Sequence, residues 1–371
     1  MSGSRYIVID SFNSEFEKVK LEDVLEYEQP TNYIVESEDY NDLFKTPVLT
    51  AGKSFILGYT NEENGIYNNP LPVIIFDDFT TATQYVNFRF KVKSSAMKIL
   101  KANNERANIT FLYYLMQHIK FDSSDHKRYW ISQYSQIQIP LPPISIQEEI
   151  VAEIETYQKI IDGAKMIVEN YKPKIDIDAK WEMVELGEVC DVKSGGTPDR
   201  ENPKYWNGNI PYIKTGQIFF NYIFEADEFI SQEGLENSSA RIIPSDTILM
   251  AMYGQGVTRG RVAILKINAA INQAVSAILP DNKKLDIQFL FYQLQGLYEH
   301  LRKISDARGG NQSNLNSKLI KELKISIPTI NIQRQIVSRI EKEQELVNAN
   351  KQLIEIFEQK IKDRIAKVWG E

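Results

Sequence analysis

Residue types that build metal centres and disulfide frameworks are nearly missing from this sequence. Its 371 residues include one cysteine, Cys190, and three histidines. A single cysteine excludes an internal disulfide and is typical of a reducing compartment, so we expect the protein in the cytoplasm. The same shortage argues against a zinc site built from cysteine and histidine. We therefore expect no metal ligands in this chain.

Long apolar runs and a secretory leader are missing too. No stretch reaches the ~18 apolar residues of a membrane span, so we expect no membrane partner. Residues 1–18 lack a basic segment followed by an apolar block. The composition is 43% hydrophobic, 25% charged and 11% aromatic, which excludes disorder as the main state. The length indicates more than one domain.

Catalytic signatures are also missing. Adenine methyltransferases carry an Asp/Asn-Pro-Pro-Tyr/Phe tetrapeptide, and the nearest string, Asn69–Pro72, has no adjacent prolines. Asp77 and Asp78 are neighbours that point to opposite faces of a strand, which disfavours a metal-dependent nuclease. The histidines have no nucleophile or partner at a useful spacing. We therefore expect no catalytic residue in this chain.

The net charge of −7 leaves DNA binding open. Residues 14–42 carry ten acids and two lysines, but residues 86–106 carry six basic residues and one acid. Residues 241–272 likewise carry four basic residues and one acid. Because salt screens charges within ~8–10 Å, a basic segment can hold a phosphate even in an acidic chain.

The most informative feature is an internal duplication. Three pairs of segments match in the same order: 16–24 with 181–189, 109–114 with 287–292, and 137–151 with 323–337. Their offsets drift from 165 through 178 to 186, so the second copy carries about 21 more residues. Three collinear matches indicate two copies of one unit.

Each copy contains short runs that predict strands and longer ones that predict helices. Apolar or alternating runs bounded by Gly, Pro, Asn or Asp predict strands at 72–76, 86–92, 247–251 and 261–265. Residues 94–119 and 284–304 have the pattern of helices. We therefore expect a compact α/β domain in each copy.

A heptad pattern closes each copy. Apolar residues recur at alternating spacings of four and three, the pattern of helices that pair along a seam. The proposed seam residues are Ile150, Ile154, Tyr157, Ile161, Val168, Ile336, Ile340, Val347, Asn350, Ile354 and Phe357. Equivalent helices from two copies are expected to pair antiparallel around a pseudo-twofold axis. The alternative is that each helix packs only on its own domain.

A set of motifs resembles one protein family. The motifs are Trp181–Val189, Ser194–Pro198, Ile210–Ile213, Thr215–Gly216, Met250–Arg261, Asn272–Ala274 and Gly309–Gln312, with the Ile-Pro…Gln…Ile helix entry. In this order, and in two copies, they make nearly the whole chain resemble the specificity subunit of type I restriction–modification systems. The first copy departs from the second: it has Phe16 for Trp181 and lacks a Gly-Gly-Asn-Gln counterpart.

The resemblance implies a DNA sequence-specificity subunit that catalyses nothing. Two target-recognition domains would each read one half of a bipartite, asymmetric site in double-stranded DNA. The helix pair would set the gap and dock two modification subunits. No cofactor is implied for this chain, because S-adenosylmethionine would be bound by the modification subunits and ATP and Mg by the restriction (translocase) subunits.

The predicted fold class is α/β (α+β): two duplicated target-recognition domains joined by two long antiparallel coiled-coil helices, with pseudo-twofold symmetry. The predicted boundaries are 1–143 for the first recognition domain, 144–176 for the central spacer helix, 177–329 for the second recognition domain and 330–371 for the C-terminal spacer helix.

Candidate DNA contacts follow from side-chain chemistry, since amides pair with adenine edges and arginine pairs with guanine or phosphate. In the first domain they are Lys53, Thr80, Thr81, Thr83, Gln84, Lys91 and Lys93. In the second they are Thr197, Lys214, Thr215, Gln217, Tyr253, Gln255, Arg259, Arg261, Asn272, Gln273, Arg308, Asn311 and Gln312. Segment 253–261 is also compatible with a tight hairpin whose arginines face solvent, and Asn272 and Gln273 with satisfying a buried strand end.

Two other function classes stay open from the residues alone. One is a coiled-coil interaction scaffold whose β-rich heads bind protein or glycan instead of DNA. The clustering of Arg259, Arg261 and Arg308 with glycine and amide residues favours DNA, because a scaffold has no need of it. An enzyme with an unrecognised active site is the weakest alternative.

Overall fold

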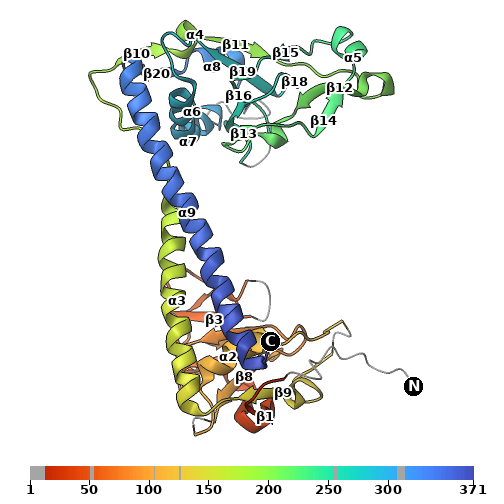
Figure 1. Cartoon of the computed structure of the whole chain (residues 1–371), viewed down its shortest axis with the longest axis vertical. Helices are drawn as coiled ribbons and strands as arrows, with labels where there is room; N and C mark the ends of the chain where they lie inside the picture. The colour runs from red at the N-terminus through yellow and green to blue at the C-terminus, as the bar shows by residue number, and fades with distance from the viewer. Residues whose placement is uncertain (1–12, 51–53, 104, 125–126, 255–256, 307–313) are drawn as a thin grey trace. The chain divides into compact units, whose positions relative to one another are not determined.

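The structure, a computed structural model, describes residues 13–50, 54–103, 105–124, 127–254, 257–306 and 314–371 (Figure 1). Its internal contacts divide the chain into two compact units. The first unit combines residues 1–169 with residues 350–371, and the second comprises residues 170–349. Each unit therefore contains one copy of the duplicated domain, and the first also includes the end of the chain.

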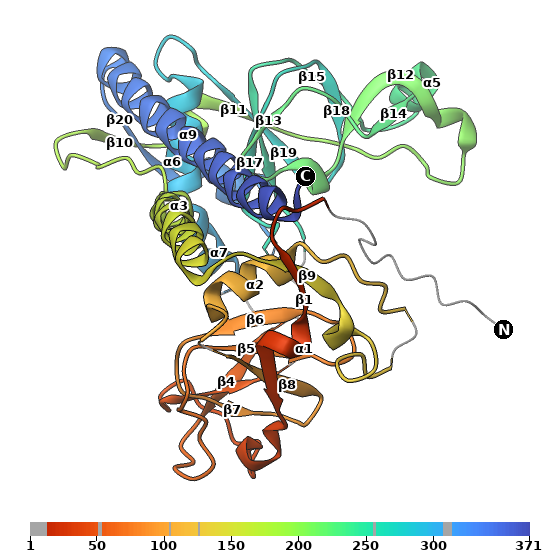
Figure 2. The same ribbon diagram turned by 60° about the horizontal axis from the view of Figure 1, so that its bottom comes forward.

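Two sheets build the first domain. The larger is antiparallel, in the order β2 (Leu25–Glu28), β8 (Met97–Ala102), β5 (Val73–Asp77) and β6 (Thr83–Val86). The smaller has the order β4 (Ile56–Thr60), β3 (Thr46–Leu49) and β7 (Lys91–Val92), with β3 and β7 parallel. The helix α2 (Ile109–Gln117) packs on β5, β6 and β8 (Figure 2).

The second domain repeats both sheets and adds one strand to each. The larger sheet has the order β11 (Cys190–Ser194), β19 (Val275–Pro280), β16 (Thr247–Ala251), β17 (Val262–Leu265) and β13 (Tyr222–Ile223). The smaller has the order β14 (Glu228–Ile230), β12 (Trp206–Ile213), β18 (Ala269–Ile271) and β15 (Ile242–Ile243), with β12 and β18 parallel. The strands β13 and β15 have no equivalent in the sheets of the first domain, where the chain is shorter.

A two-stranded ribbon precedes the long helix in both units. It pairs β1 (Glu17–Lys20) with β9 (Gln138–Leu141) and β10 (Glu182–Glu185) with β20 (Lys324–Ile327). The registers correspond, because Val19 lies opposite Ile139 as Val184 lies opposite Ile325. These are the segments whose sequences match, so the duplication extends to the register of the strands.

The repeated glutamine explains why the helix entry is the best-matched segment. Gln147 is fully buried, accepts a hydrogen bond from the Asn108 backbone N–H at 2.8 Å, and donates to the carbonyls of Pro142 and Arg106 at 2.7 and 3.1 Å. Gln333 makes the same three bonds, to the Asp286 N–H at 2.7 Å and to two carbonyls at 2.8 and 2.9 Å. One side chain thus satisfies three backbone groups in each domain.

The remaining helices are short apart from α6 and α7. They are α1 (Leu21–Val24), α4 (Leu186–Val189), α5 (Gln232–Glu236), α6 (Ile287–Gly296), α7 (Tyr298–Asp306), α8 (Ser317–Lys321) and the 3-10 turns η1 (Pro30–Tyr33), η2 (Tyr134–Gln136), η3 (Pro203–Tyr205) and η4 (Thr215–Gln217). Both α2 and α6 begin with a side-chain cap, Asn108 and Asp286, which accepts two backbone N–H groups of the first turn.

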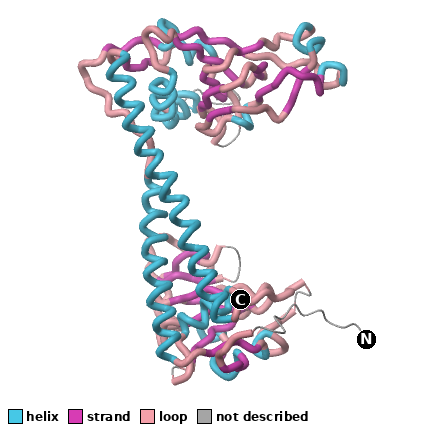
Figure 3. The backbone as a smooth tube through the Cα atoms, in the orientation of Figure 1, coloured by secondary structure: helices cyan, strands magenta, loops and turns pink. Residues whose placement is uncertain are grey.

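Two long helices follow the ribbons: α3 (Ile144–Asn170) and α9 (Ile330–Trp369). In the first unit α3 lies beside the last part of α9 (Figures 1 and 3). Glu153 accepts from Arg364 at 2.8 Å and Lys165 pairs with Glu358 at 3.3 Å, so rising numbers in α3 meet falling numbers in α9. The helices are therefore antiparallel there.

The heptad positions are buried or partly buried in both helices. Ile150, Ile154 and Ile161 are at most 1% exposed, and the Tyr157 ring lies 5.3 Å from that of Phe357. Val168, Ile336, Asn350, Ile354 and Phe357 are partly buried, whereas Ile340 and Val347 are buried. Ile365, Val368 and Trp369 end α9 inside the core of the first domain. The pairing expectation is thus met in the first unit.

Two predicted elements are wrong in part. Residues 94–119 contain the strand β8 before α2 begins at Ile109. Lys98 and Lys101 interrupt an otherwise apolar run, and Lys98 is buried because Asp78 neutralises it at 3.2 Å. The run 86–92 divides between β6 and β7 of different sheets, since Asn87, Phe88 and Arg89 are exposed.

Candidate nucleic-acid interface

Several candidate contacts of the second domain meet where two parallel strands end. Ile213 at the end of β12 lies opposite Ile271 at the end of β18. Lys214 and Thr215 follow the first strand, and Asn272 and Gln273 follow the second. Because parallel strands end at the same edge of a sheet, these four residues share that edge.

A glycine loop completes this edge. A side chain at Gly195 would lie 2.1 Å from the Ile271 carbonyl oxygen, and one at Gly196 would lie 2.3 Å from the Ser239 backbone. Only glycine permits so close an approach. The loop thereby places Thr197 against Gln273, with which it shares a hydrogen bond, and 2.8 Å from the Tyr212 hydroxyl. The two glycines of the Gly-Gly-Thr-Pro motif are thus required by packing.

The hairpin between β16 and β17 starts at the same edge. The Met252 N–H donates to the Ala274 carbonyl at 2.8 Å, directly after Asn272 and Gln273. Tyr253 is 37% exposed, and the Arg261 guanidinium lies 5.3 Å from the ring of Phe219. The strands β16 and β17 pair as an antiparallel hairpin, but Arg259 is buried and Arg261 is half-buried, so the alternative of solvent-facing arginines is wrong for these two side chains.

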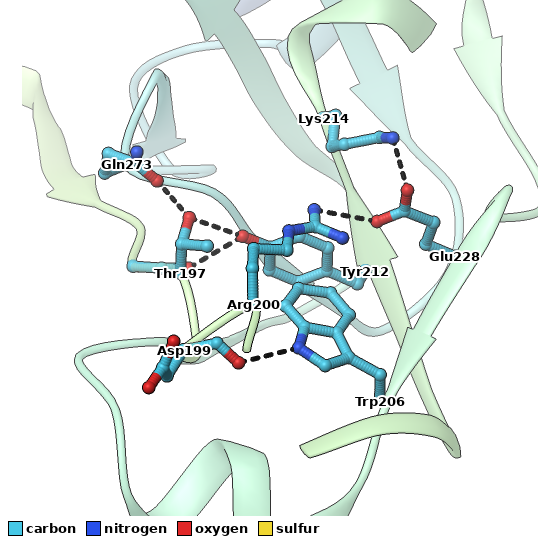
Figure 4. Close-up of polar contacts among 9 residues, drawn as sticks. Thr197, Asp199, Arg200, Trp206, Tyr212, Lys214, Glu228 and Gln273 are labelled. Carbon is cyan, nitrogen blue, oxygen red and sulfur yellow. Dashed lines mark hydrogen bonds and ion pairs between the residues drawn. The ribbon is translucent and has the colours of Figure 1, made fainter. Parts of the chain in front are cut away.

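We name these segments, residues 195–200, 214–217, 252–254, 257–261 and 272–274, the second recognition edge. Figure 4 shows a polar cluster that joins members of this edge to Trp206, Tyr212 and Glu228. The Arg200 guanidinium carbon lies 3.6 Å from the ring centroid of Trp206, and its Nη2 donates to Glu228 at 2.9 Å. Lys214 donates to the other oxygen of the same carboxylate.

Arg200, Trp206 and Glu228 are residues that the sequence reasoning missed. They lie in a stretch without periodic pattern, and Glu228 is acidic, which is not the expected charge for DNA contact. The signal that could have revealed Arg200 was its position, because it stands two residues after the Gly-Gly-Thr-Pro motif, next to Asp199. Burial raises the pKa of the Glu228 carboxyl, but hydrogen bonds from Lys214 and Arg200 outweigh it and lower the pKa overall.

The first domain has the corresponding edge with different side chains. Lys93 follows β7 and donates its N–H to Leu49 at 2.8 Å, as Asn272 donates to Ile213 at 3.1 Å. Thr80 and Thr81 form the turn between β5 and β6, where the Thr80 hydroxyl donates to Asp77 at 2.7 Å. Thr83 accepts a bond from Gln117, whereas Gln84 is exposed. We name residues 50, 78–84 and 93–96 the first recognition edge.

Burial or internal hydrogen bonds limit three candidate contacts. Lys91 is 3% exposed, lies 2.6 Å from Glu62 and donates to the Asn64 carbonyl at 2.7 Å, so it serves the interior of the first domain. Arg259 is 9% exposed and its side chain has little access to DNA. Gln217 is half-buried and donates to the Glu225 carbonyl at 3.2 Å. Charge in the sequence did not reveal these internal partners.

Five candidates lie outside the described residues: Lys53, Gln255, Arg308, Asn311 and Gln312. Within the described ranges, no group of three or more His, Cys, Asp or Glu side chains is placed to hold a metal ion. No helix in the same ranges has both the length and the apolar character needed to cross a bilayer.

Comparison with known proteins agrees with this arrangement. The sequence profile of the type I restriction modification DNA specificity domain matches residues 13–169 and again 178–359. The EcoR124I/EcoR124II specificity subunit of Escherichia coli is 33% identical over 359 residues, which cover 90% of this chain and 88% of that protein. The duplication in the sequence is thus the duplication of this domain.

Two solved structures share the fold. The S subunit of a type I restriction-modification system from M. genitalium aligns with a TM-score of 0.56 and 14% identity, covering 97% of both chains. A chain from a structural study of complex assembly and conformational transition in a type I R-M system aligns with a TM-score of 0.59 and 18% identity, covering 97% of this chain and 98% of the other.

The chain belongs to the type I restriction modification DNA specificity family. Its role is therefore DNA sequence specificity within such a system, and it is a non-catalytic subunit. Specificity subunits of these systems bind DNA and assemble with modification and restriction subunits. The scaffold and enzyme alternatives raised by the sequence are not needed.

Proposed function

We propose that each recognition domain reads one half of a bipartite DNA site, the first through residues of 1–143 and the second through residues of 177–329. The observation that carries this proposal is the repeated edge. In each domain a pair of parallel strands ends beside a hairpin. The pair is β3 with β7 in the first domain and β12 with β18 in the second. The side chains on the two edges differ, which fits an asymmetric site.

The proposed contacts are the exposed or half-exposed members of the two edges. In the first domain they are Thr80, Thr81, Thr83, Gln84 and Lys93. In the second they are Thr197, Lys214, Thr215, Tyr253, Arg261, Asn272 and Gln273. Amides and hydroxyls among them suit base edges, and the cations suit phosphate or guanine.

The spacer helices, residues 144–176 and 330–371, are proposed to set the gap between half-sites and to dock two modification subunits. Restriction (translocase) subunits would join that assembly, which would work in the cytoplasm. Support comes from the antiparallel pairing of α3 with the end of α9. S-adenosylmethionine would be bound by the modification subunits, and ATP and Mg by the restriction subunits.

Methylation of a plasmid library by this chain reconstituted with its modification subunits tests the proposal. We expect adenine methylation at two short motifs separated by a fixed gap. Inserting one heptad into α3 and one into α9 adds ~10 Å to each helix, so the gap should widen while both motifs stay unchanged. Methylation at one continuous motif, or new motifs after the insertion, would contradict the proposal.

A further inference from the structure

We propose that Arg200 determines specificity by reading a guanine in the half-site of the second domain, with Trp206 and Glu228 as positioning residues. This inference rests on the proposed function and names a contact that the sequence motifs did not suggest. It is argued from how the Arg200 side chain is held, how many of its donors are engaged, and where it lies.

The Arg200 side chain is held on an aromatic surface. Its guanidinium carbon lies 3.6 Å from the Trp206 ring centroid and 6.0 Å from that of Tyr212 (Figure 4). Trp206 is itself fixed, because its indole N–H donates to the Asp199 carbonyl at 2.9 Å and its ring meets Tyr212 edge-on at 5.4 Å. A cation on a tryptophan face is stabilised by the ring quadrupole.

Glu228 holds the Arg200 guanidinium in place by a hydrogen bond, in addition to its contact with Trp206. It accepts from Arg200 Nη2 at 2.9 Å and pairs with Lys214 through its other oxygen. One carboxylate therefore serves two cations, and the cluster of these three side chains keeps one net positive charge. The strand pairing places this carboxylate, since Glu228 of β14 lies opposite Tyr212 of β12.

Most of the donors of Arg200 stay available. A guanidinium has five N–H groups, and Glu228 is its one hydrogen-bond acceptor among the residues that the structure describes. The side chain is 50% exposed. Arg200 therefore combines a fixed position with free donors, whereas an ordinary surface arginine must lose rotamer freedom to bind.

Arg200 lies in the second recognition edge, among the proposed DNA contacts. It lies in the loop that starts at Gly195 and Gly196, and Thr197 of that loop bonds both Gln273 and Tyr212. Guanine presents O6 and N7 side by side in the major groove, a pair that matches two N–H groups of one guanidinium. A phosphate can instead be bound by a point charge, such as that of the neighbouring Lys214.

The experiment uses the full chain reconstituted with its modification subunits and a plasmid library in which both half-sites are randomised. We expect a guanine in the second half-site of the unchanged protein. Arg200→Ala should lower discrimination at that one position by about 10- to 100-fold, the range for loss of a bidentate contact. Arg200→Lys should restore little of it. The first half-site serves as an internal control for folding and assembly.

Glu228→Gln separates positioning from simple structural support. It keeps a hydrogen-bond acceptor but removes the negative charge, so binding to unrelated DNA should strengthen while discrimination at the same guanine falls. A merely structural role would weaken both. Lys283→Ala is the charge control, because Lys283 follows β19 at the end away from Gln273 and is exposed; it should alter neither half-site motif.

Three results would overturn the inference. One is a second half-site without guanine. Another is a uniform loss of methylation in Arg200→Ala with an unchanged motif and a log–log salt slope of binding lower by about one, which would identify a phosphate contact. The third is a Glu228→Gln protein with both motifs and unspecific affinity unchanged. Failure of the proposed function looks different, because the unchanged protein would then methylate no bipartite site.

Discussion

The two recognition domains have the same internal framework but different polar chemistry at their edges. The fully buried Gln147 and Gln333 make the same three backbone hydrogen bonds, and α2 and α6 start at equivalent caps. At the edges, by contrast, Lys93 stands where the second domain has Asn272. Residues that satisfy the backbone are thus retained between the copies, whereas residues facing outward have diverged.

The difference between the two domains also reaches the interior, as Lys98 shows. Lys98 in β8 is opposite Phe76, and Ser276 in β19 is opposite Met250, so Lys98 and Ser276 occupy equivalent sites. The first domain buries a cation there and neutralises it with Asp78 at 3.2 Å. Met252 of the second domain occupies the site equivalent to Asp78. The Met252 N–H donates to the Ala274 carbonyl as the Asp78 N–H donates to the Ala96 carbonyl. The buried charge of Lys98 in the first domain therefore requires Asp78 as its partner.

Removing that partner should have the largest effect on stability. Asp78→Asn keeps an oxygen to accept the backbone N–H of Trp130, which donates to Asp78 Oδ1 at 2.9 Å, but it leaves Lys98 charged and buried. We expect a loss of about 3–5 kcal/mol in the free energy of unfolding of the first domain. Hydrogen exchange of peptides from each domain measures this, and the second domain should be unaffected.

The double variant Asp78→Asn with Lys98→Met sharpens the same comparison. It removes the buried charge at this site, where the second domain also has none, so most of the lost stability should return. If the double variant were no more stable than Asp78→Asn alone, the buried charge would not be the cause.

Replacing the repeated glutamine should have the next largest effect, and it should be similar in both domains. Gln147→Ala and Gln333→Ala each leave one N–H and two carbonyls without their partner, at a cost of about 2–4 kcal/mol. Chemical denaturation followed by hydrogen exchange compares them. Gln158→Ala and Gln344→Ala are the controls, because these side chains bond only within exposed helix surface; unequal losses in the two domains would disprove equivalence.

The helix caps should have a smaller effect. Asn108→Ala and Asp286→Ala each remove two hydrogen bonds to the first turn, a loss of about 1 kcal/mol. Because asparagine and aspartate cap about equally well, the exchanges Asn108→Asp and Asp286→Asn should be nearly neutral. A large effect of either exchange in thermal unfolding would show that the two caps differ in more than residue type.

The weakest effect is expected in the helix pair of the first unit. Hydrogen bonds from the Tyr157 hydroxyl and the Arg364 guanidinium lower the pKa of Glu153 below its ordinary 4.5. The contribution of the Glu153 carboxylate to the free energy of unfolding is therefore complete above pH 4.5 and is lost as the pH falls through the lowered pKa. Glu153→Gln should cost about 0.5 kcal/mol at neutral pH and less in acid, because the stabilising contribution of the ionised carboxylate is lost as the pH falls below 4.5 through the lowered pKa. Denaturant unfolding at neutral pH and in acid checks this.

The sequence predicted best what repeats. Matched segments revealed the duplication because Gln147 and Gln333 must satisfy the same backbone groups, and the heptads revealed the helix seam because its positions are buried. The sequence predicted least where a charged side chain is paired with an opposite charge from a distant segment. Lys91, Lys98 and Glu228 each bind an opposite charge distant in sequence, and no local pattern encodes such a partner. The strand β8 and the Arg200 cluster were missed for this reason.

The last residues of α9 have a consequence for how the protein is made. Ile365, Val368 and Trp369 are at most 3% exposed within the core that Leu21, Phe111 and Ile150 also form. A ribosome delivers these three side chains only after it has translated the whole second unit. The domain begun first is thus completed last, and a nascent chain released early leaves apolar surface of that core uncovered.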